Sequence, residues 1–331
     1  MNVTIKDVAR AANVSVATVS RVLNKKTNVS PGTADTVRSA IEKLGYNPSF
    51  QGRDLRKNEA GRILVVTATI RRDFYTDVLE GIEQAALAEG FDIIVAPSHD
   101  DPAHEMRLLG MLFTHSADGV ILLAPKSDAK TISGLADSHN VAVCLERVEH
   151  CKALTVTIDN IRAGKDATSY LIGKGHKKIA MISAETRSQS STDREIGYLQ
   201  ALKDNDIPYN EQYVYYGDYG NESGAEGCEA LLNLKNPPTA IFCASDMMAI
   251  GAVRAAAKQK RKVGKDILIF GFGNIPFSRI FTPHISTVEH PRVLQGRIVT
   301  EKLIQNIKSG MRDNGLYILP HSLILRETTG D

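Results

Sequence analysis

The sequence predicts a small all-α N-terminal domain followed by two doubly wound α/β lobes. Two observations support this prediction. Residues 1–45 contain three short stretches of helical periodicity with capping signals, and residues 62–273 alternate short apolar stretches with longer helical ones. Alternation of this kind is typical of parallel sheets that are covered by helices on both faces. A chain of 331 residues is also long enough for two or three domains.

Capping signals define the three N-terminal helices. The first covers residues 4–12, the second begins after the N-cap Ser15, and the third opens at the N-cap Ser30, with a proline next to it, and ends at Gly45. Because only a short turn separates the first two helices, we predict helix-turn-helix geometry.

Residues 46–62 (YNPSFQGRDLRKNEAGR) predict a linker, because they combine proline and glycine with four basic side chains and few apolar ones. After this linker come two series of predicted strands, which indicate two similar lobes. Ligands are expected where the carboxyl ends of these strands face each other. The first series is RILVVTATI, FDIIVAP, DGVILLA and VAVCLER, and the second is LTVTID, KIAMIS, YVYYG, TAIFCAS and ILIFGFG.

Charge is unevenly distributed along the chain. Residues 1–62 hold 11 Lys and Arg against 5 Asp and Glu, whereas the remainder holds 29 against 33. A basic head on a mildly acidic body indicates a polyanionic partner at one end of the chain. The four cysteines are scattered without metal-ligand spacing, and no apolar stretch resembles a signal peptide or a membrane span. We therefore expect a cytoplasmic protein with reduced thiols and no membrane partner.

Several longer motifs resemble the LacI family of bacterial transcription regulators. TIKDVARAANVSVATVSRVLN and VSPGTADTVRSAIEKLGYNPS resemble the family headpiece. LEGIEQAALAEGFDIIV, ADGVILL, PTAIFCASDMMAIGAV, STVEHP and LILRETT extend the resemblance over essentially the whole chain. QGRDLRKNEAGRILVV and NPPTAIFCASDMMAIGAV are most similar to cytidine-repressor-type members of this LacI/GalR-type family.

The resemblance implies a domain organisation. A helix-turn-helix headpiece would cover residues 1–46, a hinge residues 47–61, and an effector-binding and dimerisation core residues 62–331. The core would have two lobes of the periplasmic-binding-protein type. One lobe would comprise about 62–160 and 292–320, and the other about 161–291 and 321–331.

The second helix would be the DNA-reading element of the headpiece. A recognition helix in the major groove needs small side chains that can approach base edges, and Val16 and Ala17 meet that need. Arg21 would contact a base or the backbone, and the other apolar side chains of this helix would form the core. The full set implied to contact double-stranded operator DNA is Thr4, Ile5, Val16, Ala17, Thr18, Ser20, Arg21, Asn24, Asn28, Val29, Ser30, Thr33, Tyr46 and Leu55.

Leu55 matches the family's hinge leucine, which wedges into the minor groove at the centre of the operator. The sequence departs from the family pattern at two neighbouring positions. Gly52 stands where alanine is usual, and Asp54 brings a negative charge near the phosphates. A flexible tether without DNA contact is the alternative interpretation of this segment.

The resemblance places an effector site between the lobes. Aromatic faces at Phe74 and Tyr75 together with a few polar groups suit a nucleoside or a sugar, and neither requires a metal or a cofactor. Gly273 stands where the family usually has an aspartate that grips ligand hydroxyls, which favours a nucleoside or moves that task to Asn274 or a water. The implied set is Arg72, Phe74, Tyr75, Glu146, Arg194, Tyr219, Asp246, Gly273, Asn274 and His290.

Four alternatives remain at this point. The aromatic residues could be core side chains that line the cleft, and Arg194 could hold a structural carboxylate such as Asp246. A small-molecule binding protein of the periplasmic type would share the two lobes, but it would lack the basic head and carry a signal peptide. An enzyme would need a catalytic set, and the acidic and histidine-rich stretch HDDPAHE at 99–105 is more simply a loop that caps the following helix, or else a contact to the ligand at the rim of the cleft.

We therefore expect a ligand-responsive repressor that is not an enzyme and binds a palindromic operator as a homodimer. The closing stretch ETTGD has no heptad pattern, so we expect no coiled-coil tetramer.

Overall fold

The computed structural model describes residues 3–23, 29–46, 60–184 and 188–331. The chain divides into two compact units, residues 1–60 and residues 61–331. None of the described helices is long and apolar enough to cross a membrane.

The N-terminal unit contains the three predicted helices, α1 (Ile5–Ala11), α2 (Val16–Leu23) and α3 (Pro31–Leu44). Their caps agree with the sequence signals. The Ser15 hydroxyl accepts a hydrogen bond from the Thr18 amide at 3.1 Å, and the Ser30 hydroxyl accepts one from the Thr33 amide at 3.3 Å. Gly45 ends α3 with φ of 58°, a left-handed conformation that favours glycine. The helices pack around a small apolar core of Val8, Ala9, Ala12, Val19, Val37 and Ala40.

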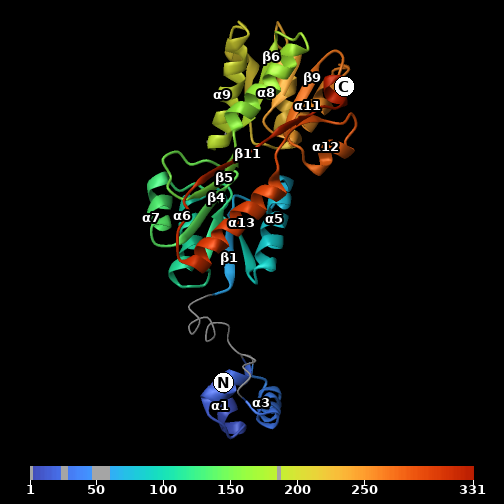
Figure 1. Ribbon diagram of the computed structural model, residues 1–331. Helices are drawn as coiled ribbons and strands as arrows, with labels where there is room; N and C mark the ends of the chain where they lie inside the picture. The colour runs from blue at the N-terminus through green and yellow to red at the C-terminus, as the bar shows by residue number, and fades with distance from the viewer. Residues whose placement is uncertain (1–2, 24–28, 47–59, 185–187) are drawn as a thin grey trace. The chain divides into compact units, whose positions relative to one another are not determined.

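The first lobe of residues 61–331 is a six-stranded parallel sheet of order β11-β5-β4-β3-β1-β2. Alternate residues of β1 pack on opposite faces. Ile63 packs with α5 and α13, whereas Leu64 packs with α6 and α7, and the helices lie on the two sides of the sheet in Figure 1. The strands are β1 (Arg62–Thr67), β2 (Asp92–Pro97), β3 (Gly119–Leu122), β4 (Asn140–Cys144), β5 (Leu154–Ile158) and β11 (Leu316–Leu319). The helices are η1 (Asp73–Tyr75), α5 (Thr76–Ala88), α6 (Pro102–Phe113), α7 (Ala129–Ala136) and α13 (Arg292–Ser309).

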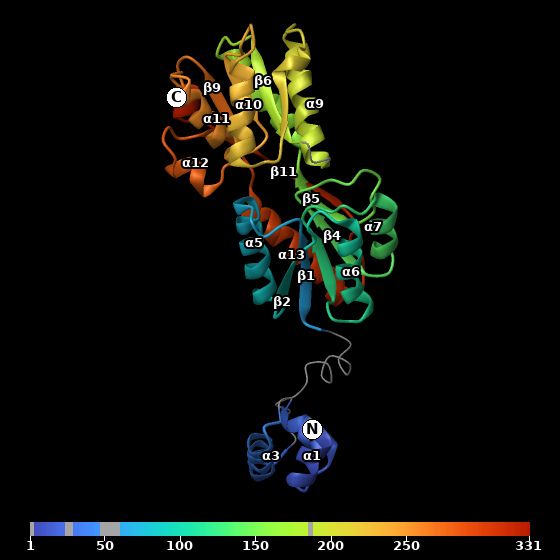
Figure 2. The same cartoon turned by 180° about the vertical axis from the view of Figure 1, so that it is seen from behind.

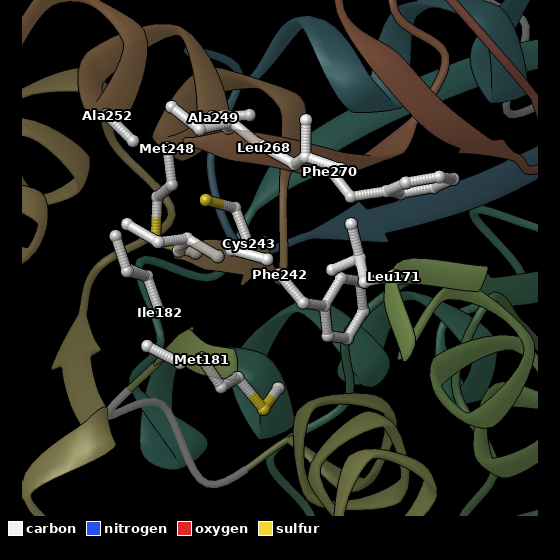
Figure 3. Close-up of a cluster of buried hydrophobic side chains, with 14 of the residues drawn as sticks. Leu171, Met181, Ile182, Phe242, Cys243, Met248, Ala249, Ala252, Leu268 and Phe270 are labelled. Atoms are coloured by element: carbon white, nitrogen blue, oxygen red, sulfur yellow. The ribbon is translucent and has the colours of Figure 1, made fainter. Parts of the chain in front are cut away.

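The second lobe repeats this architecture with the order β12-β10-β9-β8-β6-β7, and only the β10–β12 pair is antiparallel. Its largest buried cluster centres on Phe242 and Phe270, with Met248 and Leu171 against them (Figure 3). The strands are β6 (Ile179–Ala184), β7 (Val214–Gly217), β8 (Ala240–Cys243), β9 (Leu268–Gly273), β10 (Ser286–Glu289) and β12 (Ser322–Ile324). The helices are α8 (Asn160–Gly173), α9 (Gln189–Asp204), η2 (Glu211–Tyr213), α10 (Asn221–Leu232), α11 (Asp246–Lys258), α12 (Pro276–Ile280) and η3 (Glu327–Thr329).

The chain passes between the two lobes three times. It crosses from β5 to α8, returns from β10 to α13, and crosses again between β11 and β12. Every strand predicted up to residue 273 is present, but the grouping of LTVTID with the second series was wrong: this strand is β5, which pairs with β4 and β11 in the first sheet. The sequence analysis did not predict β10, β11 and β12, which have three or four residues each.

Glycine pairs bring neighbouring helices unusually close. A Cβ atom on Gly197 of α9 would lie 2.1 Å from the Ile161 carbonyl oxygen of α8, which is too close for any side chain. Equivalent contacts join α5 to α13 and α10 to α11, through the glycines Gly81, Gly296, Gly224 and Gly251. In each pair, backbone packs directly against backbone.

Candidate functional site

The first turn of α2 exposes small side chains on the outside of the N-terminal unit. Val16 is 37% exposed and Ala17 is exposed, whereas Val19 is completely buried against the other two helices. Arg21, one turn further along the helix, is also exposed. The prediction that the remaining apolar residues of this helix belong to the core is confirmed, because Val22 and Leu23 pack against the same cluster as Val19. The helix therefore separates a buried apolar stripe from an exposed face that can approach a base pair.

Four of the other predicted DNA-contacting residues lie at helix starts. Thr4 and Ile5 are at the beginning of α1, and Ser30 and Thr33 are at the beginning of α3. Helix N-termini present backbone amides to phosphates. Val29 precedes α3, Tyr46 follows it against the apolar core, and Thr18 and Ser20 are half-buried on α2. Asn24, Asn28 and Leu55 lie outside the described residues.

A cavity of about 540 Å³ lies between the two lobes of residues 61–331 and is lined by both. This volume is within the usual range for small-molecule sites. The lining contains eight of the ten predicted effector residues, which are Arg72, Phe74, Tyr75, Glu146, Arg194, Tyr219, Asp246 and His290. Gly273 and Asn274 are outside it. Glu146 follows β4 and Asp246 follows β8, so the site lies at the carboxyl ends of parallel strands.

Arg194 is the deepest cationic side chain of the cavity and is only 5% exposed. Its Nε donates to Asn160 Oδ1 at 2.9 Å and its Nη1 donates to the Ala244 carbonyl at 2.8 Å. The guanidinium stacks on the Phe272 ring at 3.6 Å. Burial lowers the pKa of Arg194 from its usual value. These contacts fix the orientation of the side chain while it lines the cavity.

Asp246 does not form an ion pair with Arg194 in the described structure. Its carboxylate accepts from the Thr287 hydroxyl at 2.5 Å and from the Ile275 amide at 2.9 Å. Burial raises the pKa of Asp246 to about 6, against the lowering effect of these two hydrogen bonds. The carboxylate therefore holds the loop after β9 to β10.

Direct contacts join the two lobes across the cavity. Glu146 accepts hydrogen bonds from the amide of Ser190 at 3.0 Å and from its hydroxyl at 2.7 Å. The Arg72 guanidinium lies 5.2 Å from the centre of the Tyr219 ring. Two of the predicted effector residues of the first lobe thus touch the second lobe directly.

Gly273 and Asn274 lie behind the cavity wall. Gly273 ends β9 with φ of 125°, a conformation that side chains rarely adopt. The Asn274 amide donates to Glu289, and its oxygen accepts from Arg326 at 2.7 Å and from Ser278 at 3.3 Å. The amide of Asn274 is therefore already engaged within the second lobe.

The sequence analysis missed several lining residues, among them Phe272, Ser190 and Asp218. Phe272 lies in a strand that was predicted. Its position one residue before the carboxyl end of that strand could have indicated that it lies near the cavity. Ser190 and Asp218 are in loops or helix starts with ordinary composition. Only the packing of the lobes brings them to the cavity.

The stretch 99–105 caps the following helix, as the simpler interpretation expected, and its Asp100 also lines the cavity. Asp101 accepts from the Ala103 amide at 2.9 Å at the start of α6. Glu105 is fully buried and accepts from the amides of Lys126 at 3.0 Å and Ser127 at 2.9 Å. Among the described residues, no group of three or more His, Cys, Asp or Glu side chains is arranged to hold a metal ion.

Comparison with known proteins decides the family. Residues 4–49 match the model of bacterial regulatory proteins of the lacI family, and residues 60–326 match that of periplasmic binding proteins and the sugar binding domain of the LacI family. The second match alone covers most of the chain. The chain belongs to the LacI family.

Individual relatives extend over the full length of this LacI-family chain. It is 33% identical over 329 residues to the HTH-type transcriptional repressor CytR of Escherichia coli K12, covering 98% of this chain and 96% of CytR. The structure of the lac repressor dimer bound to operator and the anti-inducer ONPF matches with a TM-score of 0.87 and 25% identity, covering 99% of each chain. A complex of the regulator CelR with cellobiose matches with a TM-score of 0.74 and 28% identity, covering 99% of this chain and 100% of CelR.

The expectations for fold class and function class are confirmed by these matches. The LacI-family chain is a ligand-responsive, DNA-binding transcription regulator and not an enzyme. Its two matched regions correspond to the two units of the structure, one with the α2 surface and one with the cavity.

The pKa of Asp246 predicts a pH-dependent stability. Because the folded chain keeps a proton on Asp246 up to about pH 6, whereas an ordinary aspartate loses it near 3.8, the folded state binds more protons in this interval. The contribution of Asp246 to the free energy of unfolding therefore falls as pH rises from about 4 to 6, by up to about 3 kcal/mol.

Urea unfolding of the wild type and of Asp246→Asn, at about pH 4 and about pH 7, measures this contribution. We expect the wild type to lose stability relative to Asp246→Asn as pH rises. Asp92→Asn, at an exposed position of β2, is the control and should follow the wild type. Parallel pH profiles for the wild type and Asp246→Asn would contradict the prediction.

Proposed function

We propose that this LacI-family regulator is a repressor that binds a palindromic operator as a homodimer and responds to a small effector in the interlobe cavity. One observation carries the proposal: a packed headpiece exposes the small first turn of α2, in the same chain as a cavity lined by two lobes. The first feature suits the major groove and the second suits a small ligand. Because the partner is DNA, we also propose a cytoplasmic, nucleoid-associated location.

We propose the following division of labour along the chain. Residues 1–46 bind DNA, residues 47–61 form the hinge with Leu55 as the minor-groove wedge, and residues 62–331 bind effector and form the dimer. In the headpiece, Val16 and Ala17 contact thymine methyl groups, and Arg21 contacts a base or a phosphate. Thr4, Ser30 and the other hydroxyl-bearing residues at helix starts position the headpiece on phosphates, as do the two asparagines Asn24 and Asn28.

Exposed apolar residues on one side of the core support dimerisation. Ile280 and Phe277 of α12 are 70% and 45% exposed, and Leu87 of α5 is 66% exposed. Helices α5 and α12 lie on the same side of the two lobes in both views (Figures 1 and 2). Large apolar side chains exposed in this way are typical of an interface, and a two-fold axis would pair them with the same residues of a second copy. The lac repressor structure described above is also a dimer.

The effector proposal rests on the lining of the cavity. Aromatic rings at Phe74, Tyr75 and Tyr219 can cover a flat ligand, and Arg194 supplies a fixed hydrogen-bond donor. A nucleoside or a sugar-like molecule fits this combination. The effector shifts the balance between lobe arrangements only through its different affinity for each of them. It would change that balance most directly by competing for Glu146, which joins the lobes through Ser190.

The operator prediction tests the headpiece. Selection from random duplexes should enrich an inverted repeat, because two headpieces related by a two-fold axis read two half-sites. Arg21→Ala should weaken binding to the selected site by about 1–3 kcal/mol, or roughly 5- to 150-fold, in a mobility-shift titration. Arg38→Ala, at an exposed position of α3 paired with Asp35, is the matched control and should change binding much less. Enrichment of a single asymmetric half-site would exclude the symmetric dimer.

The dimer prediction tests the patch on α12. Ile280→Glu places a charge in the proposed interface and should weaken self-association at least about tenfold in sedimentation equilibrium. Ile318→Glu is the matched control, because Ile318 is 53% exposed on β11 at the opposite edge of the first sheet from β2. It should leave the dimer intact. A monomeric wild type, or equal dissociation constants for all three chains, contradicts this interface.

The effector prediction tests the cavity. A thermal-shift screen of nucleosides and sugars identifies the best binder, which is then titrated by calorimetry. Arg194→Ala should lower its affinity at least about tenfold, because a hydrogen bond to a charged group contributes about 1.5–3 kcal/mol. Tyr219→Ala should also weaken binding, whereas Tyr209→Ala, an exposed tyrosine outside the lining, should not. Changes below about twofold for both cavity variants would show that the ligand binds elsewhere.

A further inference from the structure

Three buried polar side chains near the inner end of the cavity have atoms without hydrogen-bond partners. His290, Arg292 and Gln295 are between 0 and 3% exposed. Within the described part of the chain, both ring nitrogens of His290, Nε and Nη1 of Arg292 and both amide atoms of Gln295 are buried and unpartnered. Gln295 lies near enough to His290 to raise its pKa, but no hydrogen bond of ordinary geometry joins them. Burying a polar group without a hydrogen-bond partner costs free energy. Several such groups in one place therefore indicate that a partner is missing.

The electrostatic surroundings of these atoms favour an anion. Arg292 and Gln295 lie in the first turn of α13, an 18-residue helix with no side-chain cap and no acidic residue in its first turn. The N-terminus of such a helix carries partial positive charge. His290 is neutral, because burial and the nearby Arg194 and Arg292 guanidinium groups hold its pKa well below its usual value. Nη2 of Arg292 pairs with the half-buried Asp77 and donates to the Asn274 carbonyl at 3.3 Å, whereas Nε and Nη1 have no hydrogen-bond partner among the described residues.

Of these three residues only His290 lines the cavity, whereas Arg292 contacts the ring of Phe74, which is itself a lining residue. Phe74 and His290 both line the cavity, and their ring centres are 5.2 Å apart. The Arg292 guanidinium also lies 5.2 Å from the centre of the Phe74 ring. A Cβ atom on Gly273 would lie 3.4 Å from this ring and 3.7 Å from Arg292 Nη1. Phe74 is only half-buried, so its ring has room to rotate. Such a rotation would open the cavity toward Arg292, next to Gly273, which has no side chain to fill the space.

We propose that the inner end of the effector cavity is an anion subsite, and that the effector carries a carboxylate. The carboxylate would accept from the free nitrogens of Arg292 and from the His290 ring, next to the N-terminus of α13. A dianionic phosphate fits less well, because the lining already holds six acidic side chains against four Lys and Arg. This inference rests on the proposed effector site and specifies the class of molecule that it takes.

Small anions test the subsite without knowledge of the effector. The experiment is thermal unfolding of the full chain in acetate, acetamide, phosphate or chloride. Each compound is added up to about 50 mM at constant ionic strength. Acetate should raise the unfolding temperature saturably above the chloride baseline, and acetamide should not. A response to acetate no larger than to chloride overturns the proposal. A larger response to phosphate than to acetate overturns the assignment of a carboxylate.

Two isosteric variants locate the response. Gly273→Asp places a carboxylate near Arg292 and should abolish the acetate effect, whereas Gly273→Asn has the same size and the same unfavourable φ but no charge, and should retain it. Arg292→Gln should also abolish the effect. Equal acetate responses in the Asp and Asn variants would place the anion elsewhere and overturn the proposal.

The acetate measurements and the effector titrations test the two proposals separately. If Arg194→Ala leaves effector affinity unchanged, the cavity is not the effector site, whatever acetate does. If Arg194→Ala abolishes effector binding and acetate has no effect, the cavity remains the effector site but the effector has no carboxylate subsite at Arg292.

Discussion

The three crossings of the chain between the lobes constrain the rest of the core. Each crossing leaves or enters the carboxyl end of a parallel sheet, so the two sheets must present these ends to each other. The residues at the crossings are also residues of the site. Asn160, at the first crossing, holds the Arg194 side chain, and His290, at the second, lines the cavity. A ligand that contacts Arg194 or His290 therefore acts directly on the segments about which the lobes can move.

The contacts that now join the lobes across the cavity are few and polar. Each hydrogen bond from Ser190 to the Glu146 carboxylate contributes about 1.5–3 kcal/mol, and the contact of Arg72 with the Tyr219 ring contributes about 0.5–1 kcal/mol. Interactions of this size leave two lobe arrangements close in free energy. A ligand with a modest preference for one of them can then change the population of both.

The sequence was most informative where structure is local. The caps at Ser15 and Ser30 and the apolar spacing around Val19 predicted the headpiece, because these signals act within one helical turn. The longer buried strands were predicted for the same reason. The strands β10, β11 and β12 were missed. β11 and β12 are only partly buried, so they have no continuous apolar pattern, and β10 is a four-residue strand whose sequence STVE is mostly polar.

For the candidate site too, the sequence indicated which residues are present but not which groups they contact. The resemblance supplied eight lining residues, but it could not show that both oxygens of Asp246 are engaged by Thr287 and Ile275. It also could not show that Asn274 is held by Glu289 and Arg326. These roles depend on which groups meet after packing, and the identity of a residue does not determine that.

The glycine-paired helices have a consequence for how this scaffold can change. Since α5–α13, α8–α9 and α10–α11 are joined backbone to backbone, a larger side chain at any of these glycines would force the pair apart. Part of the cavity lining lies outside these helix pairs, in the short helix η1 that holds Phe74 and in the loops that hold Glu146 and Tyr219, and is free of that restriction. New ligand specificities can therefore arise by drift in the loops while the helix pairs stay fixed. The same division gives a protein engineer a rigid frame on which a sensor for another metabolite could be selected.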